Sequence, residues 1–246
     1  MLKIILKNGT RVFWKKEEYD AYEYDGKVLC IYKMHKLVGM YNVDIINNLI
    51  LKENWIRERK WFFMLKIFIN PGHDMDLDPG ACANGIREVD IALAIGEKLK
   101  KTMEVIGYPC QLLQSDNLNG ETKGKPNVCA TANNSGADIF ISIHCNSAAN
   151  ASAKGTETLV YALDGGKSNI LAKCIQAQIV NSLNMVDRGI KERSDLCVLR
   201  ETSMPAVLVE TAFISNQEDA YKLMYRIEEF ANAISRGITD AEKLFW

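Results

Sequence analysis

The sequence predicts an α/β fold, in which helices flank a twisted, mostly parallel sheet, with a small antiparallel β unit at the N-terminus. From residue 64 onward, apolar runs of strand length alternate with longer stretches of helical periodicity, which is typical of a mostly parallel sheet. Residues 1–63 differ from the rest and hold 11 of the 21 aromatic residues. We therefore expect two domains: a small β-rich accessory unit with a linker over 1–63, and a larger domain over 64–246.

The composition excludes several classes of protein. The 246 residues are 48% hydrophobic and 25% charged with a net charge of −1, which excludes a disordered or coiled-coil chain as the main state. This charge balance gives no overall electrostatic case for binding nucleic acid or an anionic membrane. No apolar run approaches the roughly 18 residues that a membrane-spanning helix needs. We expect no nucleic-acid partner and no membrane insertion, and the composition does not indicate an oligomeric state.

The N-terminal unit contains two signals for hairpin turns, an Asn-Gly pair at 8–9 and an Asp-Gly pair at 25–26. Each pair tolerates the positive φ angles of a tight turn and therefore predicts an antiparallel hairpin. The run at 42–51 predicts a further strand, and 52–63 predicts a linker or short helix. The aromatic residues could stack on sugars, and a half-buried sheet face explains them equally well.

The larger domain shows strand and helix patterns in turn. Two of its helices are expected to end at Gly107 and Gly136, because glycine readily adopts the conformation that follows a helix C-terminus. The expected strands span 65–70, 110–115, 137–145, 155–163 and 205–213, and the expected helices span 86–107, 127–136, 168–184 and 218–245.

Three proton-active side chains stand where apolar strands end. His73 follows the strand at 65–70, His144 ends the strand at 137–145, and Glu210 closes a third apolar run. Ligands of open α/β sheets bind in the crevice at the carboxyl ends of the strands. We therefore expect these three side chains at one crevice.

Glu88 is a fourth candidate, at the start of an expected helix. At helical spacing its face continues through Ala92, Ile95 and Leu99. A carboxylate on an apolar stripe needs a partner, because an unpaired buried charge is very costly. Metal coordination is one way to provide that partner.

Two imidazoles and a carboxylate form the ligand set of many catalytic zinc sites, which keep a fourth position open for water. His73, Glu88 and His144 could supply that set, and Glu210 could shuttle a proton. Structural roles remain open for each of them. A strand-end histidine can be hydrogen-bonded, and Glu88 can be a first-turn acid favoured by the helix dipole. Glu210 can pair with an arginine such as Arg188 or Arg200.

Six segments carry a resemblance to a known family: INPGH (69–73), IREVD (86–90), ADIFISIHCN (137–146), DRGIK (187–191), LCVLRETSMPAVLVETAFISN (196–216) and FANAISRGI (230–238). With these motifs in order, the chain from about 65 to 245 resembles the zinc-dependent N-acetylmuramoyl-L-alanine amidases. They are the third amidase family of cell-wall hydrolases and include many phage endolysins.

The resemblance implies one catalytic α/β domain, with a Zn²⁺ ion held by His73, Glu88 and His144 and with Glu210 as the catalytic acid/base. It implies a peptidoglycan hydrolase that cleaves the amide between the lactyl group of N-acetylmuramic acid and the L-alanine of the stem peptide. The first residues hold no apolar core of a signal peptide. We therefore expect a phage or prophage lysin, made in the cytoplasm and acting at the cell wall after release.

The sequence departs from the family pattern in its loops. Asn70 stands where the family usually has Asp, positions 74–75 replace a common glycine pair, and 117–128 lacks the usual arginine-containing lead into a helix. The stretch 145–154 is too short for the regulatory helix that some relatives insert there. We therefore expect an open, constitutively active site.

Other local motifs are weaker. The segment DMDLDPG (74–80) imitates a calcium loop, but Pro79 replaces the required glycine. Cys145 and His144 are adjacent in a strand, so their side chains point to opposite faces and do not form a nucleophilic pair. The seven cysteines include no C-x-x-C pair, and we expect small buried residues in a reducing compartment.

Two other functions remain open: a catalytically silent module that binds the cell wall, and a zinc exopeptidase that acts on free peptides. For residues 1–63, the two interpretations are a wall-targeting unit and an oligomerisation unit. The tetrapeptide Met-Leu-Lys-Ile at 1–4 recurs at 64–67 and could mark a second start at Met64.

Overall fold

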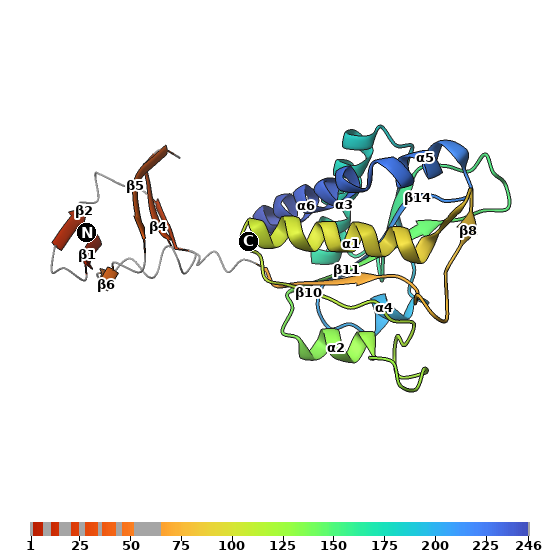
Figure 1. The fold of residues 1–246 in the computed structure, drawn as a ribbon, viewed down its shortest axis with the longest axis horizontal. Coiled ribbons are helices and arrows are strands. Elements are labelled where there is room, and N and C mark those ends of the chain that lie inside the picture. The colour runs from red at the N-terminus through yellow and green to blue at the C-terminus, as the bar shows by residue number, and fades with distance from the viewer. Residues whose placement is uncertain are drawn as a thin grey trace. The chain divides into compact units, whose positions relative to one another are not determined.

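The computed structural model describes residues 65–245 and, before them, the backbone of six strands (Figure 1). The chain divides into two compact units, Met1–Phe63 and Met64–Trp246. The linker or short helix expected over 52–63 and the recurring tetrapeptide's Met64 lie outside the described residues.

Two antiparallel sheets of three strands make up the described part of the N-terminal unit. The strands are β1 (Leu2–Leu6), β2 (Arg11–Trp14), β3 (Ala21–Tyr24), β4 (Val28–Lys33), β5 (Lys36–Asn42) and β6 (Ile46–Leu51). Their orders are β2-β1-β6 and β3-β4-β5. β1 pairs with β2 and β3 pairs with β4, as the two turn signals predict, although the turn residues themselves lie outside the description. β5 has no counterpart among the predicted strands.

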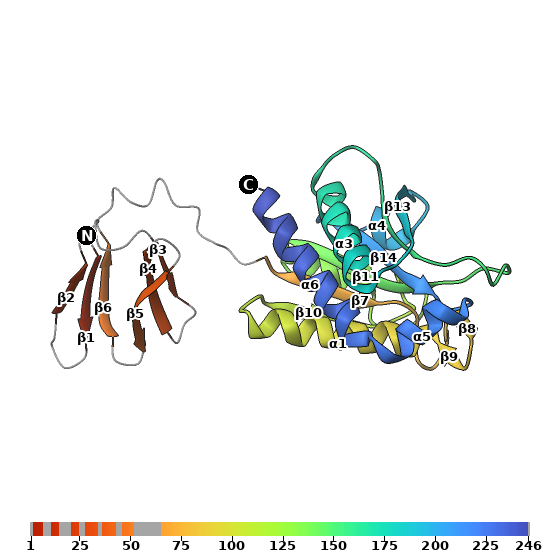
Figure 2. The ribbon, with the colours of Figure 1, turned by 90° about the horizontal axis from the view of Figure 1, so that it is seen from above.

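The larger unit is a six-stranded sheet between two layers of helices (Figures 1 and 2). Its helices are α1 (Glu88–Val105), α2 (Val128–Asn134), α3 (Lys167–Leu183), α4 (Cys197–Arg200), α5 (Gln217–Tyr225) and α6 (Ile227–Leu244). The six strands of the sheet are β7 (Ile67–Pro71), β10 (Cys110–Leu112), β11 (Ile139–Asn146), β12 (Thr156–Val160), β13 (Asp187–Glu192) and β14 (Ala206–Phe213), and β8 (Cys82–Ala83) and β9 (Ile86–Arg87) form a separate two-stranded sheet. The helices α1, α3 and α6 cover one face of the sheet, and α2 and α4 cover the other.

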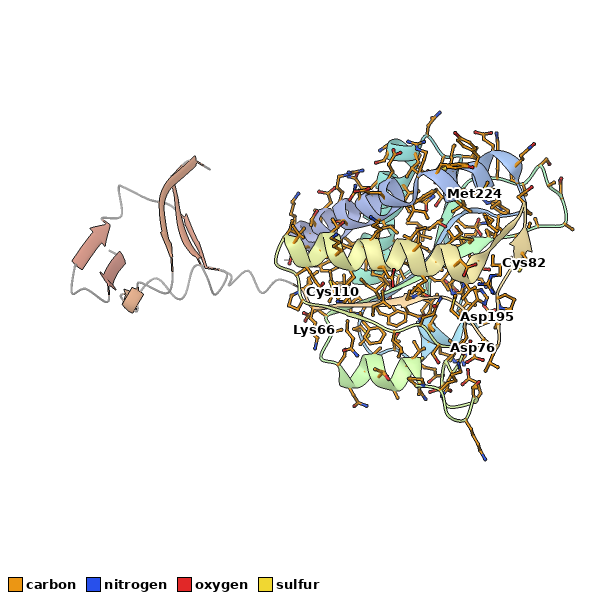
Figure 3. The ribbon with its side chains drawn as sticks, viewed as in Figure 1. Lys66, Asp76, Cys82, Cys110, Asp195 and Met224 are labelled. Carbon is orange, nitrogen blue, oxygen red and sulfur yellow. The ribbon has the colours of Figure 1, made fainter. Side chains whose placement is uncertain are left out.

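The strand order of the large sheet is β10-β7-β11-β14-β12-β13. The first four strands are parallel, which confirms the predicted sheet type. β12 runs antiparallel to β14, and β13 is parallel to β12, so the last two strands are reversed. Lys66 and Cys110, at the amino ends of β7 and β10, lie at the opposite end of the domain from Asp76, which follows β7 (Figure 3). The reversal brings the start of β12 to the edge where β7, β11 and β14 end.

The predicted elements are present with ends shifted by up to three residues, except that one predicted helix is divided and that α4, β8, β9 and β13 were not predicted. α1 and α2 are followed by Gly107 (φ 96°) and Gly136 (φ 70°), as expected for helix C-termini. The single helix predicted over 218–245 is two helices, separated at Arg226, whose φ and ψ are −127° and 29°. β13 is an additional strand; its polar sequence DRGIKE at the sheet edge lacks the apolar alternation on which the prediction depends. No described helix is long and apolar enough to cross a membrane.

Alternate residues of the central strands enter two separate cores. Isoleucines of β7 and β11, such as Ile69 and Ile141, pack with α1, α3 and α6. Phe68 and Phe140 point to the other face, where their rings stack with centroids 5.6 Å apart beneath α2 and α4. His144 and Phe140 are separated by an even number of positions on β11, so His144 lies on that second face.

Candidate metal centre

The register of the parallel strands brings the expected strand-end side chains together. His144 on β11 stands directly opposite Glu210 on β14. On the other side of β11, the Gly72 N–H donates to the Ile143 carbonyl at 2.9 Å, which continues the pairing with β7 as far as His73. The three side chains expected at one crevice therefore lie on three adjacent chain segments at the same edge.

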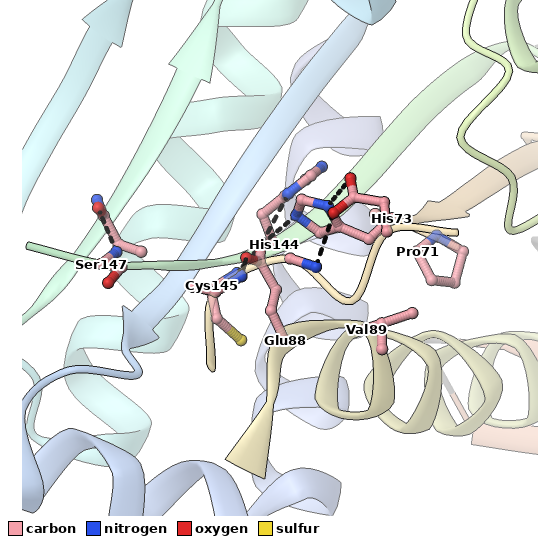
Figure 4. A network of polar contacts seen from close by, with 12 residues as sticks. Pro71, His73, Glu88, Val89, His144, Cys145 and Ser147 are labelled. Carbon is pink, nitrogen blue, oxygen red and sulfur yellow. Dashed lines mark hydrogen bonds and ion pairs between the residues drawn. The ribbon is translucent and has the colours of Figure 1, made fainter. Parts of the chain in front are cut away.

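Glu88 begins α1 at this edge, and its carboxylate connects the two histidines (Figure 4). Its Oε1 lies 3.0 Å from Nε2 of His73 and 2.9 Å from Nδ1 of His144. Its two oxygens also accept hydrogen bonds from the backbone N–H groups of Cys145 and Ala81, both at 2.9 Å. Glu88 is only 4% exposed, so these four partners replace the water molecules that would otherwise solvate its charge.

His73, Glu88 and His144 together form the His–Glu–His cluster. Its electrostatics favour positive charge beside Glu88. Burial alone would raise the pKa of Glu88, but hydrogen bonds from His144 and His73 outweigh burial and hold that pKa well below its usual range. Burial alone would lower the pKa of His73, but Glu88 and Asp78 raise it to about 9. The cluster thus holds a fixed carboxylate charge that needs a cationic partner.

The donor atoms of the cluster meet the requirements of a metal site. One ligand atom from each residue lies within 4.8 Å of the others, and the two imidazole rings are edge to face with centroids 5.0 Å apart. Nitrogen and carboxylate oxygen donors in this ratio are typical of catalytic zinc sites. The cluster could therefore hold a metal ion, and its donors are of the kind that zinc prefers.

Two glycines let the backbone approach the cluster closely. A Cβ atom at Gly72 would lie 2.2 Å from Cε1 of His144. A Cβ atom at Gly80 would lie 2.6 Å from Cδ2 of His73 and 2.8 Å from Oε2 of Glu88. Gly80 also has a φ of +66°, which glycine adopts without strain. The cluster therefore occupies space that a side chain at either position would fill.

His73 is fixed by its second ring nitrogen. Its Nδ1 lies 2.7 Å from Oδ2 of Asp78, and Oδ1 of Asp78 accepts the Gly80 N–H at 2.9 Å. The backbone of His73 has a φ of 67°, an uncommon value for a residue with a Cβ. Asp78 thus holds the ring so that Nε2 points toward Glu88, the arrangement by which carboxylates orient metal-binding histidines. Sequence reasoning missed this role, because it considered the segment around Asp78 only as a calcium loop.

Lys125 forms ion pairs with the other two acidic residues of that segment. Its Nζ lies 3.0 Å from Oδ1 of Asp74 and 3.2 Å from Oδ2 of Asp76. The ammonium group therefore provides the positive charge that a calcium ion would bring. It also ties the loop before α2 to the loop that follows His73.

Replacing Asp78 with Asn should weaken zinc binding about 10–100-fold, as loss of an outer carboxylate does in other metal sites. The neutral amide no longer stabilises the His73 orientation by charge. Competition with a chromophoric chelator measures the effect without depending on catalysis. Asp76→Asn is the matched control, because Asp76 is exposed and does not contact His73. Equal zinc affinities of the two variants would show that Asp78 does not orient the ligand.

Glu210 lies beside the cluster but does not contribute to it. Its Oε2 atom is buried and has no hydrogen-bond partner among residues 65–245. Burial raises the pKa of Glu210 to about 7; the nearby charge of His144 opposes this rise, and those of Glu88 and Glu157 support it. A carboxyl group with a pKa near neutrality and an unpartnered oxygen is suited to exchange a proton.

One alternative partner considered for Glu210, Arg188, binds another carboxylate. Its Nε donates to Oε2 of Glu157 at 2.8 Å, and Lys191 donates to the same oxygen. Oε1 of Glu157 accepts from Nδ2 of Asn146 at 3.0 Å. Glu157 stands opposite Glu210 in the β12–β14 register. Sequence reasoning missed Glu157 and Asn146, whose only signal is polarity beside the predicted strand ends.

The cysteines of residues 65–245 are free thiols. Cys129 and Cys145 are buried as expected, whereas Cys82 is exposed. The Cys145 Sγ lies 3.5 Å from Oγ1 of Thr211, and Cys145 belongs to the core opposite His144, which agrees with the expectation that the two do not pair.

Curated relatives are similar to this chain in sequence. A sporulation-specific N-acetylmuramoyl-L-alanine amidase of Bacillus subtilis (strain 168) is 35% identical over 71% of this chain and 65% of its own length. An endolysin of Bacillus phage SPP1 is 34% identical over 70% of this chain and 62% of its own length. The chain thus spans less than two thirds of either protein.

Solved structures share its fold. The CwlD amidase from Clostridioides difficile, in complex with the GerS lipoprotein, aligns with a TM-score of 0.65 and 30% identity over 73% of this chain and 99% of that chain. An N-acetylmuramoyl-L-alanine amidase from Clostridium difficile 630 aligns with a TM-score of 0.61 and 29% identity over 72% of this chain and 95% of that chain. The model of a family described as N-acetylmuramoyl-L-alanine amidase matches residues 67–240. This match covers every strand and helix around the cluster, and the chain belongs to the N-acetylmuramoyl-L-alanine amidase family.

Proposed function

We propose that this protein hydrolyses the amide between the lactyl group of N-acetylmuramic acid and the L-alanine of the peptidoglycan stem peptide, with zinc as its cofactor. The observation that carries the proposal is the convergence of His73, Glu88 and His144 at one strand edge, next to the carboxyl group of Glu210. Membership of the amidase family supports the choice of bond. We assign catalysis to the unit 64–246, because all four side chains belong to it.

The His–Glu–His cluster would hold the zinc ion, which supplies Lewis acidity for the scissile carbonyl and lowers the pKa of a water molecule when bound. Glu210 carries the proton. Its ionised carboxylate accepts a proton from the attacking water as the new C–O bond forms. It then donates that proton to the amide nitrogen as the C–N bond breaks, so that L-alanine leaves with a free amine. A pKa of about 7 lets Glu210 perform both steps near neutral pH.

We assign the activity to lysis of the cell wall by a phage or prophage. Similarity to the phage SPP1 endolysin supports this setting, and similarity to the sporulation-specific amidase supports peptidoglycan as the substrate in either setting.

Digestion of purified peptidoglycan tests the proposal. We expect stem peptides with a new N-terminal L-alanine and unbroken glycan strands, as measured by mass spectrometry of the products. A chelator should stop the release, and added zinc should restore it. Binding to the wall without products would favour a silent binding module. Cleavage of free peptides that lack muramic acid would favour an exopeptidase.

A further inference from the structure

Arg188 presents a pre-oriented guanidinium group beside the proposed active site. Its Nε is held by Glu157 at 2.8 Å, and its Cζ lies 4.7 Å from the centre of the Phe213 ring. Within residues 65–245, the two terminal nitrogens of Arg188 have no hydrogen-bond partner, and the side chain is 33% exposed. One edge of the guanidinium is therefore fixed, and the edge that could bind two oxygens is open.

Two cations of β13 meet at one buried carboxylate beside this group. Arg188 and Lys191 share a single carboxylate oxygen of Glu157, which is itself buried. The acids of β13 are engaged elsewhere, because Asp187 accepts a hydrogen bond from Gln176 and Glu192 accepts one from a backbone N–H. Among residues 65–245, neither Asp187 nor Glu192 pairs with Arg188, so the terminal nitrogens of Arg188 stay available to a ligand.

The rim is connected to the catalytic strands. Glu157 stands opposite Glu210 across the β12–β14 pairing, and directly opposed residues share a face of the sheet. Arg188 comes from β13, the next strand outward (Figure 2). Neighbouring strands are about 4.8 Å apart, so the backbone of Arg188 lies on the order of 10 Å from that of Glu210, and the guanidinium extends back to Phe213 on β14. An extended peptide rises about 3.3 Å per residue, so the second or third residue from the cleaved bond can reach the guanidinium.

We propose that Arg188 binds a carboxylate of the stem peptide, two or three residues from the scissile amide, and that the enzyme therefore prefers peptides with a free carboxylate there to amidated ones. The inference rests on the proposed amidase function, which supplies a substrate of this kind. A guanidinium matches both oxygens of a carboxylate, and an arginine already held in place loses little freedom on binding. The charge of Lys191 adds to the attraction.

The test compares two muramoyl peptides that differ only in whether this carboxylate is free or amidated, cleaved by the full chain. Arg188→Gln should raise the KM for the acidic peptide about 10–100-fold, the range for a lost hydrogen bond to a charged group. Its kcat for that peptide, and both constants for the amidated peptide, should change less than about threefold. Arg188→Lys keeps a cation beside Glu157 and should recover only part of the preference. Arg236→Gln, on α6, is the matched control and should leave both constants unchanged.

Each other outcome is informative. Equal losses on both peptides, in Arg188→Gln and Arg188→Lys alike, would show that Arg188 acts only through the fold and would overturn the inference. An unchanged preference would overturn it while leaving the amidase function intact. Failure of the unmodified protein to cleave either peptide would overturn the proposed function and this inference with it.

Discussion

Glu210→Gln is expected to abolish turnover while zinc stays bound. Glutamine has nearly the same shape but can neither accept the proton of the attacking water nor return it to the leaving nitrogen. Loss of such a group lowers rates by about 10²–10⁴-fold. Zinc affinity should not change, because Glu210 is not part of the His–Glu–His cluster. The measurement is kcat on a muramoyl peptide, with the zinc content of the same sample.

The pH dependence gives a second readout of the same substitution. Glu210 must be ionised to accept a proton, and its pKa is raised to about 7, so activity should increase as the pH rises through 7. The stability of the fold should change with pH in the opposite direction from the activity. Between its ordinary pKa of 4.5 and about 7, the folded protein binds a proton that the unfolded chain has lost, so the free energy of unfolding falls as the pH rises across this window. Glu210→Gln should remove this decline.

The control for this experiment is Glu218→Gln, on an exposed helix turn where Glu218 pairs with Lys154. It should retain full turnover. Glu210→Gln with turnover within about tenfold of the unmodified protein would show that another group carries the proton.

Glu88→Gln should abolish activity by a different route, the loss of the metal. Glu88 supplies the only negative charge of the cluster, and the amide of glutamine is a poor ligand. In the unmodified protein, zinc at 100 times its Kd should add about 2.7 kcal/mol to the free energy of unfolding. Thermal unfolding with and without zinc should show this increase for the unmodified protein and none for Glu88→Gln. Zinc must also displace the proton of His73, so affinity should rise with pH up to about 9.

Glu97→Gln is the matched control, because Glu97 lies on the same helix and is exposed. It should show the full zinc-dependent increase in unfolding temperature. An increase of the same size in Glu88→Gln would exclude Glu88 as a ligand.

The positions of the four candidate residues could be predicted because the alternation of strands with helices indicates a parallel sheet and because helix periodicity indicates the face of Glu88. Parallel strands end at one edge, so His73, His144 and Glu210 had to lie at that edge once the sheet was parallel, and the strand order then makes them neighbours. Glu88 followed from the apolar stripe of its helix. These are regular, short-range patterns, and a single sequence displays them fully.

The surroundings of the site could not be predicted, because they depend on contacts that leave no periodic signal. The alternation of apolar and polar residues in a strand does not indicate its direction, so the reversal of β12 and β13 was not predicted. The pairing of Glu157 with Arg188 depends on that reversal and was missed for the same reason. The role of Asp78 depends on a backbone turn of five residues that returns it to His73. The break between α5 and α6 at Arg226 has no glycine or proline that would indicate it in the sequence.

The left-handed backbone of His73 lowers the stability of the fold, while its imidazole is needed at the proposed metal site. A residue with a Cβ loses on the order of 1–3 kcal/mol at such an angle, and glycine or asparagine would relieve much of that loss. A library selected only for heat resistance would therefore favour replacements at position 73 and lose the imidazole with them. Selection of a more stable variant therefore requires a screen that measures the proposed amidase activity and heat tolerance together.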